Sequence, residues 1–215
     1  MYLPRHFEHG EGADLRRLIA AYPLATLVHQ TESGADANHI PMRWREDDQR
    51  SLLVGHVARG NRLWREADGQ PVLAIFHGPQ AYVSPQWYPS KRVDGRAVPT
   101  WNYAVVHVRG RLRAIEDADW LYAFLDELSA AHETFQPRPW RINEAPADYL
   151  QKQLRAIVGI ELTVEQIVGK YKLHQNHPDT NWQGVVDGLG GRDQGDQAVA
   201  ELMQQTANRD RSDQQ

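Results

Sequence analysis

Short runs of alternating apolar and polar residues occupy much of the first 115 positions of the chain. Alternation with a period of two is typical of a strand with one buried face. Turn-forming residues separate the runs, among them Gly34, Asp47, Asp48 and the segment 78–80. We therefore expect a meander of short strands. The expected strands are 24–30, 38–44, 51–57, 71–78 and 100–115, with a further strand from residue 156.

The apolar spacing becomes helical in three places. Asp14 as a cap and Pro23 as a stop predict one short helix between them. A second helix is expected at 117–133, and a third at 145–157. The second helix places its large apolar side chains on one face. These side chains are Trp120, Leu121, Phe124, Leu125 and Leu128.

The order of these elements predicts the fold class. Strands at regular spacing, with helices mostly after the fifth or sixth strand, favour a small antiparallel β-barrel with added helices. Gly110 is a candidate for the bend that lets such a sheet close. We expect one domain over residues 1–188. Residues 189–215 are expected to form a polar, partly mobile tail with one helix at 197–206.

Composition excludes several classes of function. The 215 residues carry a formal charge of −4 and no cysteine, so thiolate metal sites and cysteine nucleophiles are absent. An acidic chain has no global attraction for nucleic acid, and no run reaches the length of a membrane span. We expect a soluble, cytoplasmic protein. No glycine-rich phosphate loop of Rossmann or Walker type is present, and ten histidines form no recognised zinc pattern, so no metal site is expected.

Two loops after strands combine polar and aromatic residues. In the first, residues 55–64, Arg59 and Asn61 suit a phosphate monoester, whereas the alternative is a surface charge and a helix cap. In the second, residues 82–91, Ser84 and Lys91 with two aromatic side chains suit a planar anionic ligand. The alternative there is a proline-rich loop held by a packed tryptophan.

Two further clusters flank strands. Pro99 keeps the entry to the strand at 100–115 extended, and alternation then turns Trp101 and Asn102 to opposite faces. Residues 169–181 form a local positive patch through Lys170 and Lys172. The alternative for this patch is a charged edge that prevents sheet-to-sheet aggregation.

Taken in order, these stretches resemble the PaiB-type FMN-binding negative transcriptional regulators, a family with the FMN-binding split barrel fold. The resemblance covers most of residues 1–185. Its segments are "HIP" at 39–41, "GHVARGN" at 55–61, "FHGPQAYVSPQWYPSK" at 76–91, "VPTWNYAVVHVRG" at 98–110, "AIVGIEL" at 156–162 and "GKYKLHQN" at 169–176.

The resemblance implies a homodimer of six-stranded, Greek-key-like split barrels with FMN held between the subunits. The strand with His39, Ile40 and Pro41 would lie against the isoalloxazine ring. The segment containing His56 would receive the phosphate through Arg59 and Asn61. Four residues would line the pocket, namely Ser84, Lys91, Trp101 and Asn102. Three would reach the cofactor of the other subunit, namely Lys172, Gln175 and Asn176.

The chain departs from this family at two positions, with His174 where serine is usual and Arg62 where proline is usual. Three functions stay open. The first is a flavin-binding repressor of transcription, which would contact DNA directly if Arg92, Arg96, Arg109, Arg111 and Arg113 cluster. The second is an FMN-dependent oxidoreductase that uses NAD(P)H. The third is a haem-binding split-barrel protein in which His174 contacts the haem.

Overall fold

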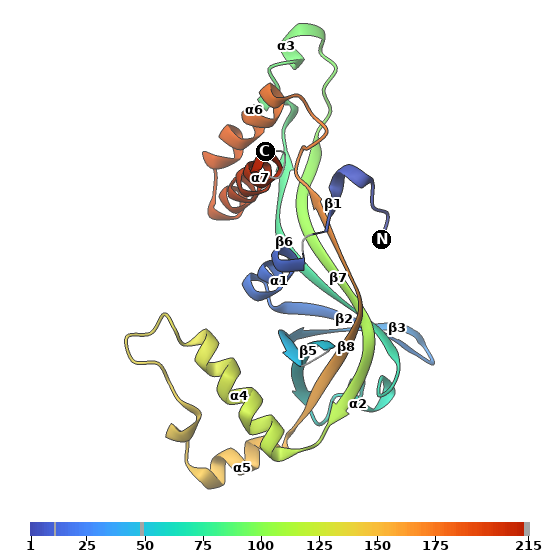
Figure 1. The fold of residues 1–215 in the computed structure, drawn as a ribbon, viewed down its shortest axis with the longest axis vertical. Helices are drawn as coiled ribbons and strands as arrows, with labels where there is room; N and C mark the ends of the chain where they lie inside the picture. Colours follow the sequence, from blue (N-terminus) through green and yellow to red (C-terminus); the bar gives the residue numbers. More distant parts are fainter. Residues whose placement is uncertain (11, 48–49, 213–215) are drawn as a thin grey trace. The chain divides into compact units, whose positions relative to one another are not determined.

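The computed structural model describes residues 1–10, 12–47 and 50–212 and contains one eight-stranded sheet (Figure 1). Seven strands follow the order β3-β2-β6-β7-β8-β5-β4, and β1 pairs with β8. The pairs β1–β8, β2–β3, β2–β6, β4–β5 and β5–β8 are antiparallel. The strands are β1 Glu8–His9, β2 Leu24–Thr31, β3 Gly34–Pro41, β4 Arg43–Asp47, β5 Arg50–Ala58, β6 Pro71–Val83, β7 Thr100–Ile115 and β8 Ile157–Lys172.

The helices lie between and after these strands. The α-helices are α1 Gly12–Ala21, α2 Leu63–Glu66, α3 Lys91–Asp94, α4 Ala118–His132, α5 Ala147–Arg155, α6 Asp179–Gly190 and α7 Gln194–Ser212. Three short 3-10 helices are η1 Arg5–Phe7, η2 Pro85–Trp87 and η3 Ile142–Glu144. The predicted class, an antiparallel β protein with helices, is confirmed.

Several details of the predicted sheet are wrong. The sheet has eight strands rather than six, and no pairing joins β3 to β4 among the described residues, so the ring is not closed. The strand expected at 38–44 is two strands, because the chain exchanges β2 for β5 as its partner at Met42. Met42 is buried, and its N–H donates to the Pro23 carbonyl at 2.9 Å. The turn expected at 78–80 is also absent, since β6 runs through it.

The chain divides into two compact units. Unit 1 comprises Met1–Leu15, His77–Val106 and Val168–Gln215, and unit 2 comprises Arg16–Phe76 and His107–Ile167. The strands β6, β7 and β8 each contribute residues to both units.

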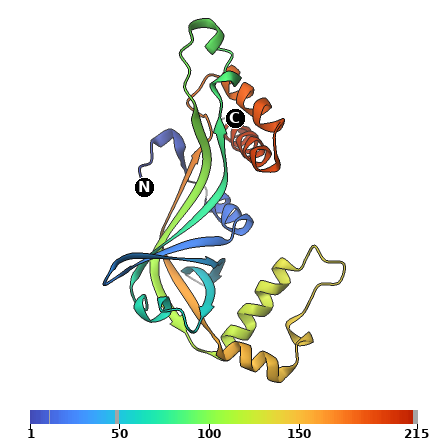
Figure 2. The ribbon, with the colours of Figure 1, turned by 180° about the vertical axis from the view of Figure 1, so that it is seen from behind.

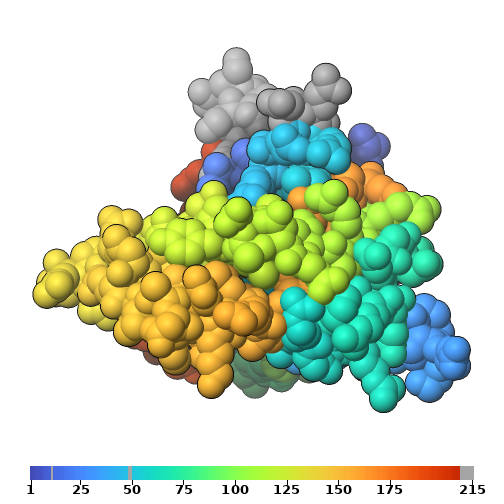
Figure 3. Space-filling view, turned by 90° about the horizontal axis from the view of Figure 1, so that it is seen from below, coloured from blue at the N-terminus to red at the C-terminus, as the bar shows by residue number. Residues whose placement is uncertain are grey.

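In unit 2, the predicted apolar face of α4 packs on the sheet. Phe124 forms a buried cluster with Leu52 and Val54 of β5. Trp120, Leu125 and Leu128 pack against this cluster, as expected for one helical face. The helices α4 and α5 lie side by side on one face (Figure 3), and the connection between them loops out from α4 (Figure 2).

In unit 1, α6 and α7 lie side by side (Figure 1). Their buried side chains are Val185, Val186 and Leu189 of α6 and Val199, Ala200 and Met203 of α7. Glycine in α6 allows Trp87 to approach closely, since a Cβ at Gly188 would lie 2.4 Å from the indole. The helix expected at 197–206 is α7, Gln194–Ser212, which is longer than predicted. The domain boundary at residue 188 stays a prediction, and residues 213–215 of the predicted tail lie outside the described residues.

Candidate functional site

In unit 2, the strand and the loop predicted to hold a flavin ring and phosphate are joined by a hydrogen bond. Asn61 follows β5, and its amide nitrogen donates to the side-chain oxygen of Asn38 on β3 at 2.7 Å. The Asn61 oxygen accepts from the Leu63 N–H at 2.9 Å, which fixes the amide orientation. A Cβ at Gly55 would lie 3.0 Å from the Pro41 carbonyl oxygen, so β5 also approaches the end of β3 closely.

The three residues predicted to face the ring follow Asn38 along β3. Ile40 is buried, whereas His39 and Pro41 are exposed. His39 forms a hydrogen bond with the Thr26 hydroxyl at 3.2 Å. The alternation that a strand imposes is thus present, with the aliphatic side chain inward and the imidazole outward.

Arg59 is held by groups other than those that hold Asn61. Its guanidinium donates to the carbonyl oxygens of Arg155 at 2.8 Å and Ile157 at 3.2 Å, and to Glu116. It lies 5.8 Å above the ring of Trp64. The guanidinium carries more N–H groups than these three acceptors use. The Asn61 amide likewise has a second N–H besides the one that it donates to Asn38. The donor set therefore fits a phosphate, although Glu116 competes for the charge of Arg59.

Arg59 also lines a cavity of about 520 Å³ beside α4 and α5. Asn61 does not line this cavity. Most of the other lining residues come from the two helices. This cavity therefore does not bring Arg59 and Asn61 together.

His56 packs against α4. Its ring centroid lies 5.9 Å from that of Phe124 in an edge-to-face arrangement. Burial lowers the pKa of His56, because the charged imidazolium would lose its hydration. His56 is thus an uncharged side chain against the core at neutral pH.

The remaining predicted residues lie in unit 1. Asn102 is fully buried, and its side-chain oxygen lies 2.8 Å from Nδ1 of His174. The Nε2 atom of His174 lies 2.8 Å from the Tyr88 hydroxyl. The Asn102 amide nitrogen donates to the Met203 sulfur of α7 at 3.3 Å.

These contacts determine the protonation of His174. An amide oxygen only accepts, so Nδ1 carries the proton and Nε2 accepts from the Tyr88 hydroxyl. Burial and the neighbouring His177 and Lys172 lower the pKa of His174 to about 4. Burial raises the pKa of Tyr88, which keeps the phenol protonated and able to donate. The result is a neutral chain of hydrogen bonds from Tyr88 through His174 to Asn102.

The other predicted residues of unit 1 have separate environments. Trp101 is half exposed and meets Tyr82 edge-to-face, on the strand face opposite Asn102, as alternation predicts. Ser84 caps η2 by accepting from the Gln86 N–H at 3.2 Å. Lys91 begins α3.

Lys172, Gln175 and Asn176 lie at the end of β8 and just after it. Lys172 donates to the Thr100 hydroxyl and to the Trp101 carbonyl. Gln175 bonds the main chain of Leu173 and Tyr171, and Asn176 lines a cavity with Lys172 and His174. These contacts could not be read from the sequence.

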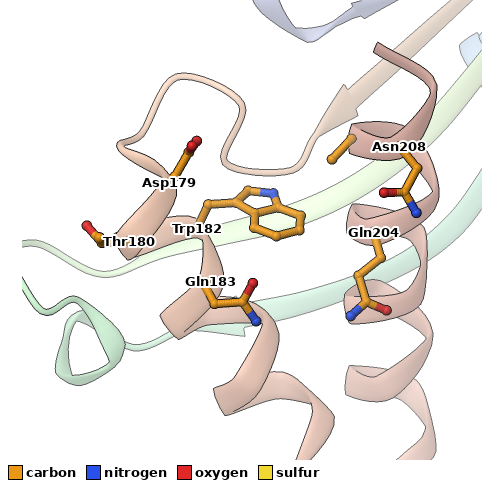
Figure 4. Close-up of a pocket in the computed structure, with 7 residues that line it drawn as sticks. Asp179, Thr180, Trp182, Gln183, Gln204 and Asn208 are labelled. Carbon is orange, nitrogen blue, oxygen red and sulfur yellow. The ribbon is translucent and has the colours of Figure 1, made fainter. Parts of the chain in front are cut away.

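A third cavity, of about 630 Å³, lies between α6 and α7. Figure 4 shows the indole of Trp182 extending from α6 toward Gln204 and Asn208 of α7. The lining is rich in amides and carries one carboxylate, that of Asp179. None of the predicted site residues lies here.

Some of the arginines whose clustering would favour direct DNA contact already form ion pairs. Arg111 lies 3.2 Å from Glu165, and Arg113 lies 3.3 Å from Glu161 on β8. Arg92 and Arg96 belong to unit 1 and these two arginines to unit 2. Over residues 1–10, 12–47 and 50–212, no group of three or more His, Asp or Glu side chains could hold a metal ion. No described helix is both long and apolar enough to cross a membrane.

The family assignment follows from sequence comparison. A family model described as "Putative FMN-binding domain" matches residues 1–166. The chain belongs to this family. One relative, protease synthase and sporulation protein PAI 2 of Bacillus subtilis, is 30% identical over 206 residues, or 95% of this chain and 97% of the relative. An uncharacterized protein of Emericella nidulans is 33% identical over 88% of this chain and 90% of its own length.

Two solved structures with this fold belong to more distant proteins. The FAD and heme binding protein of Mycobacterium smegmatis has a TM-score of 0.58 at 20% identity, covering 77% of this chain and 73% of that one. The flavocytochrome Anf3 of Azotobacter vinelandii has a TM-score of 0.54 at 16% identity, covering 79% and 72%. Membership of the FMN-binding domain family supports flavin binding by this chain.

Proposed function

We propose that this protein binds FMN between the subunits of a homodimer and represses transcription in response to the flavin. Family membership supports the choice of FMN. The similarity to the Bacillus subtilis protein along nearly the whole chain, together with the resemblance to PaiB-type regulators, supports the regulatory role over an enzymatic one. The observation that carries the flavin site is the Asn61–Asn38 hydrogen bond, which joins the loop after β5 to β3.

The roles of this chain's residues follow from the geometry of unit 2. The amide of Asn61 and the guanidinium of Arg59 have N–H groups left to donate to a phosphate. The exposed edge strand β3 offers its main chain and Pro41 to the planar ring. The flavin, when bound, supplies redox chemistry that the side chains lack. The unit 1 residues Lys172, Gln175 and Asn176 are assigned to the second subunit's cofactor only by the resemblance.

Regulation through direct DNA contact has less support. Arg111 and Arg113 pair with carboxylates of β8, which reduces the charge they offer to phosphates. A repressor with this surface would act through a partner protein or after a change in the bound flavin.

The test is flavin retention by matched variants. Wild-type protein is mixed with FMN and desalted, and the visible absorption of the retained flavin is measured. Asn61→Asp keeps the acceptor for the Leu63 N–H but replaces the amide donor with a negative charge, and it is expected to lose the flavin. Asn143→Asp makes the same change at an exposed position of η3 and is expected to retain it.

Three results would count against the proposal. Wild-type protein that keeps no flavin would remove FMN from the function. Equal retention by Asn61→Asp and Asn143→Asp would remove Asn61 from the phosphate site. Steady oxidation of NADH or NADPH by the flavin-loaded protein would replace the regulatory role with an oxidoreductase.

A further inference from the structure

One small cavity lies entirely within unit 1 and is rich in hydrogen-bond donors. Its volume is about 350 Å³, at the lower end of the range for small-molecule sites. The polar side chains around it include those of Arg96, Lys172, Asn176 and His177, and apolar contacts come from Phe7, Val98 and Pro99. Among these described lining residues there is no carboxylate. The cavity therefore has positive charge without an internal counter-ion.

The ammonium group of Lys172 is only partly satisfied by its protein contacts. Its ammonium donates to the Thr100 hydroxyl and to the Trp101 carbonyl at 2.9 Å, and both acceptors are uncharged. An ammonium has one more N–H than these two acceptors use. Burial and the neighbouring Lys170 lower the pKa of Lys172. An anion in the cavity would offset both effects, because it supplies the missing opposite charge.

The turn after β8 aims His177 at the same space. His174 has φ of 68°, the left-handed region, and is the only described non-glycine residue with positive φ. Its carbonyl accepts from the His177 N–H at 3.0 Å, and the two imidazoles stack with centroids 4.3 Å apart. Among the described residues, none forms a hydrogen bond with the ring nitrogens of His177. His174 is buried, and hydrogen bonds at both ring nitrogens hold its unfavourable backbone conformation, which in turn positions the imidazole of His177. Such backbone conformations are concentrated at binding sites.

Arg96 completes the cation pair at the rim. Its nearest described carboxylate is Asp94, at 4.0 Å, and the Arg96 side chain is 88% exposed. A guanidinium this exposed has room to turn toward a ligand, and its planar N–H groups match the two oxygens of a carboxylate.

We propose that this cavity binds a small organic carboxylate. Lys172 and Arg96 pair with its charge, His177 donates to one oxygen, and Phe7, Val98 and Pro99 contact its apolar part. His174 is a positioning residue, since both of its ring nitrogens are engaged by Tyr88 and Asn102. The residues lining this cavity all belong to unit 1, whereas those of the proposed flavin-phosphate site belong to unit 2. In this proposal Lys172 and Asn176 hold the carboxylate rather than the second subunit's flavin, which the resemblance had implied.

Isothermal titration calorimetry with benzoate tests the proposal, and benzamide serves as an uncharged ligand of nearly the same shape. Benzoate is expected to bind wild-type protein with and without FMN, and benzamide at least about tenfold more weakly, because the charge-assisted bonds are lost. Lys172→Met and His177→Phe are expected to weaken benzoate binding by about tenfold each. The second substitution keeps an aromatic ring for the stack on His174. Arg92→Met, which removes an exposed cation of α3 outside the cavity, is the control.

Arg96→Met gives a third variant, which is expected to fold as wild type does because this side chain is almost fully exposed. Equal binding of benzamide and benzoate would overturn the proposal, as would unchanged binding by all three variants. Displacement of benzoate by FMN would also overturn it, since the cavity would then belong to the flavin. Flavin absorbance is recorded on the same samples, so loss of benzoate binding and loss of flavin binding are scored separately.

Discussion

Replacing His174 with asparagine is expected to flatten the dependence of the protein's stability on pH. In the folded protein the pKa of His174 is lowered to about 4 from the ordinary 6.5, because the ring is buried and bonded as a neutral group. As the pH falls from 6.5 toward 4, the unfolded chain takes up a proton at this position before the folded chain does. The folded state therefore loses stability as the pH falls from 6.5 to 4, and above pH 6.5 the contribution of the neutral His174 to stability is fully present.

The size of this loss follows from the two pKa values. A shift from 6.5 to about 4 corresponds to a loss of about 3 kcal/mol in the free energy of unfolding between pH 7 and pH 4. Asparagine tolerates the left-handed backbone at this position but carries no proton that titrates. At pH 7, His174→Asn is expected to be less stable than wild type by about 2 kcal/mol, since Tyr88 and Asn102 lose buried partners.

The assay is urea unfolding followed by tryptophan fluorescence at a series of pH values. The difference between wild type and His174→Asn should shrink from pH 7 downward and vanish or reverse near pH 4. His132→Asn, at an exposed position on α4, should follow the wild-type curve at every pH. A difference between wild type and His174→Asn that stays constant from pH 7 to pH 4 would refute the assigned protonation state.

Three further substitutions test the packing of unit 2. Phe124→Ala is expected to lower the free energy of unfolding by about 4 kcal/mol in urea titrations, because the ring is 1% exposed; a loss under about 1 kcal/mol would contradict this core assignment. Gly110→Ala should cost about 3 kcal/mol or prevent folding, as judged by circular dichroism, since its Cβ would lie 1.9 Å from the Thr163 carbonyl oxygen and a backbone atom cannot move aside. Arg45→Ala should change the midpoint of thermal unfolding little and cost under about 1 kcal/mol, because its ion pair with Glu127 is exposed; a larger loss would mean that this pair has a structural role.

Local patterns were sufficient for most elements. The apolar face of α4 was predictable because helical spacing and burial agree at Leu121 and Phe124. The long strand β7 was predictable because every second residue is buried from Asn102 to Leu112. The order of the strands in the sheet was not predictable, because tertiary structure rather than local sequence determines which strands pair. The exchange of partners at Met42 leaves no local signal in the run 38–44, which reads as one strand.

In the candidate sites, too, single residues were recognisable from the sequence but their contacts were not. Arg59 and Asn61 were recognisable as polar residues after a strand, but their partners Glu116 and Asn38 lie 57 and 23 positions away. The pair His174 and Tyr88 is separated by 86 positions. Only the fold brings such residues together. The left-handed backbone of His174 was also unpredictable, since histidine has no preference strong enough to indicate it.

The end of the family match at residue 166 falls inside strand β8, next to the point at which the chain passes from unit 2 to unit 1, so a cut there would divide a strand. A chain cut there would keep all of β7, including Asn102, a side chain with no exposed surface in the intact protein. It would lack His174 and Met203, the two residues that satisfy that amide. The segment beyond residue 166 is therefore part of the folding unit of this protein, and a fragment made to the family boundary would be expected to aggregate rather than to report on the function of the whole chain.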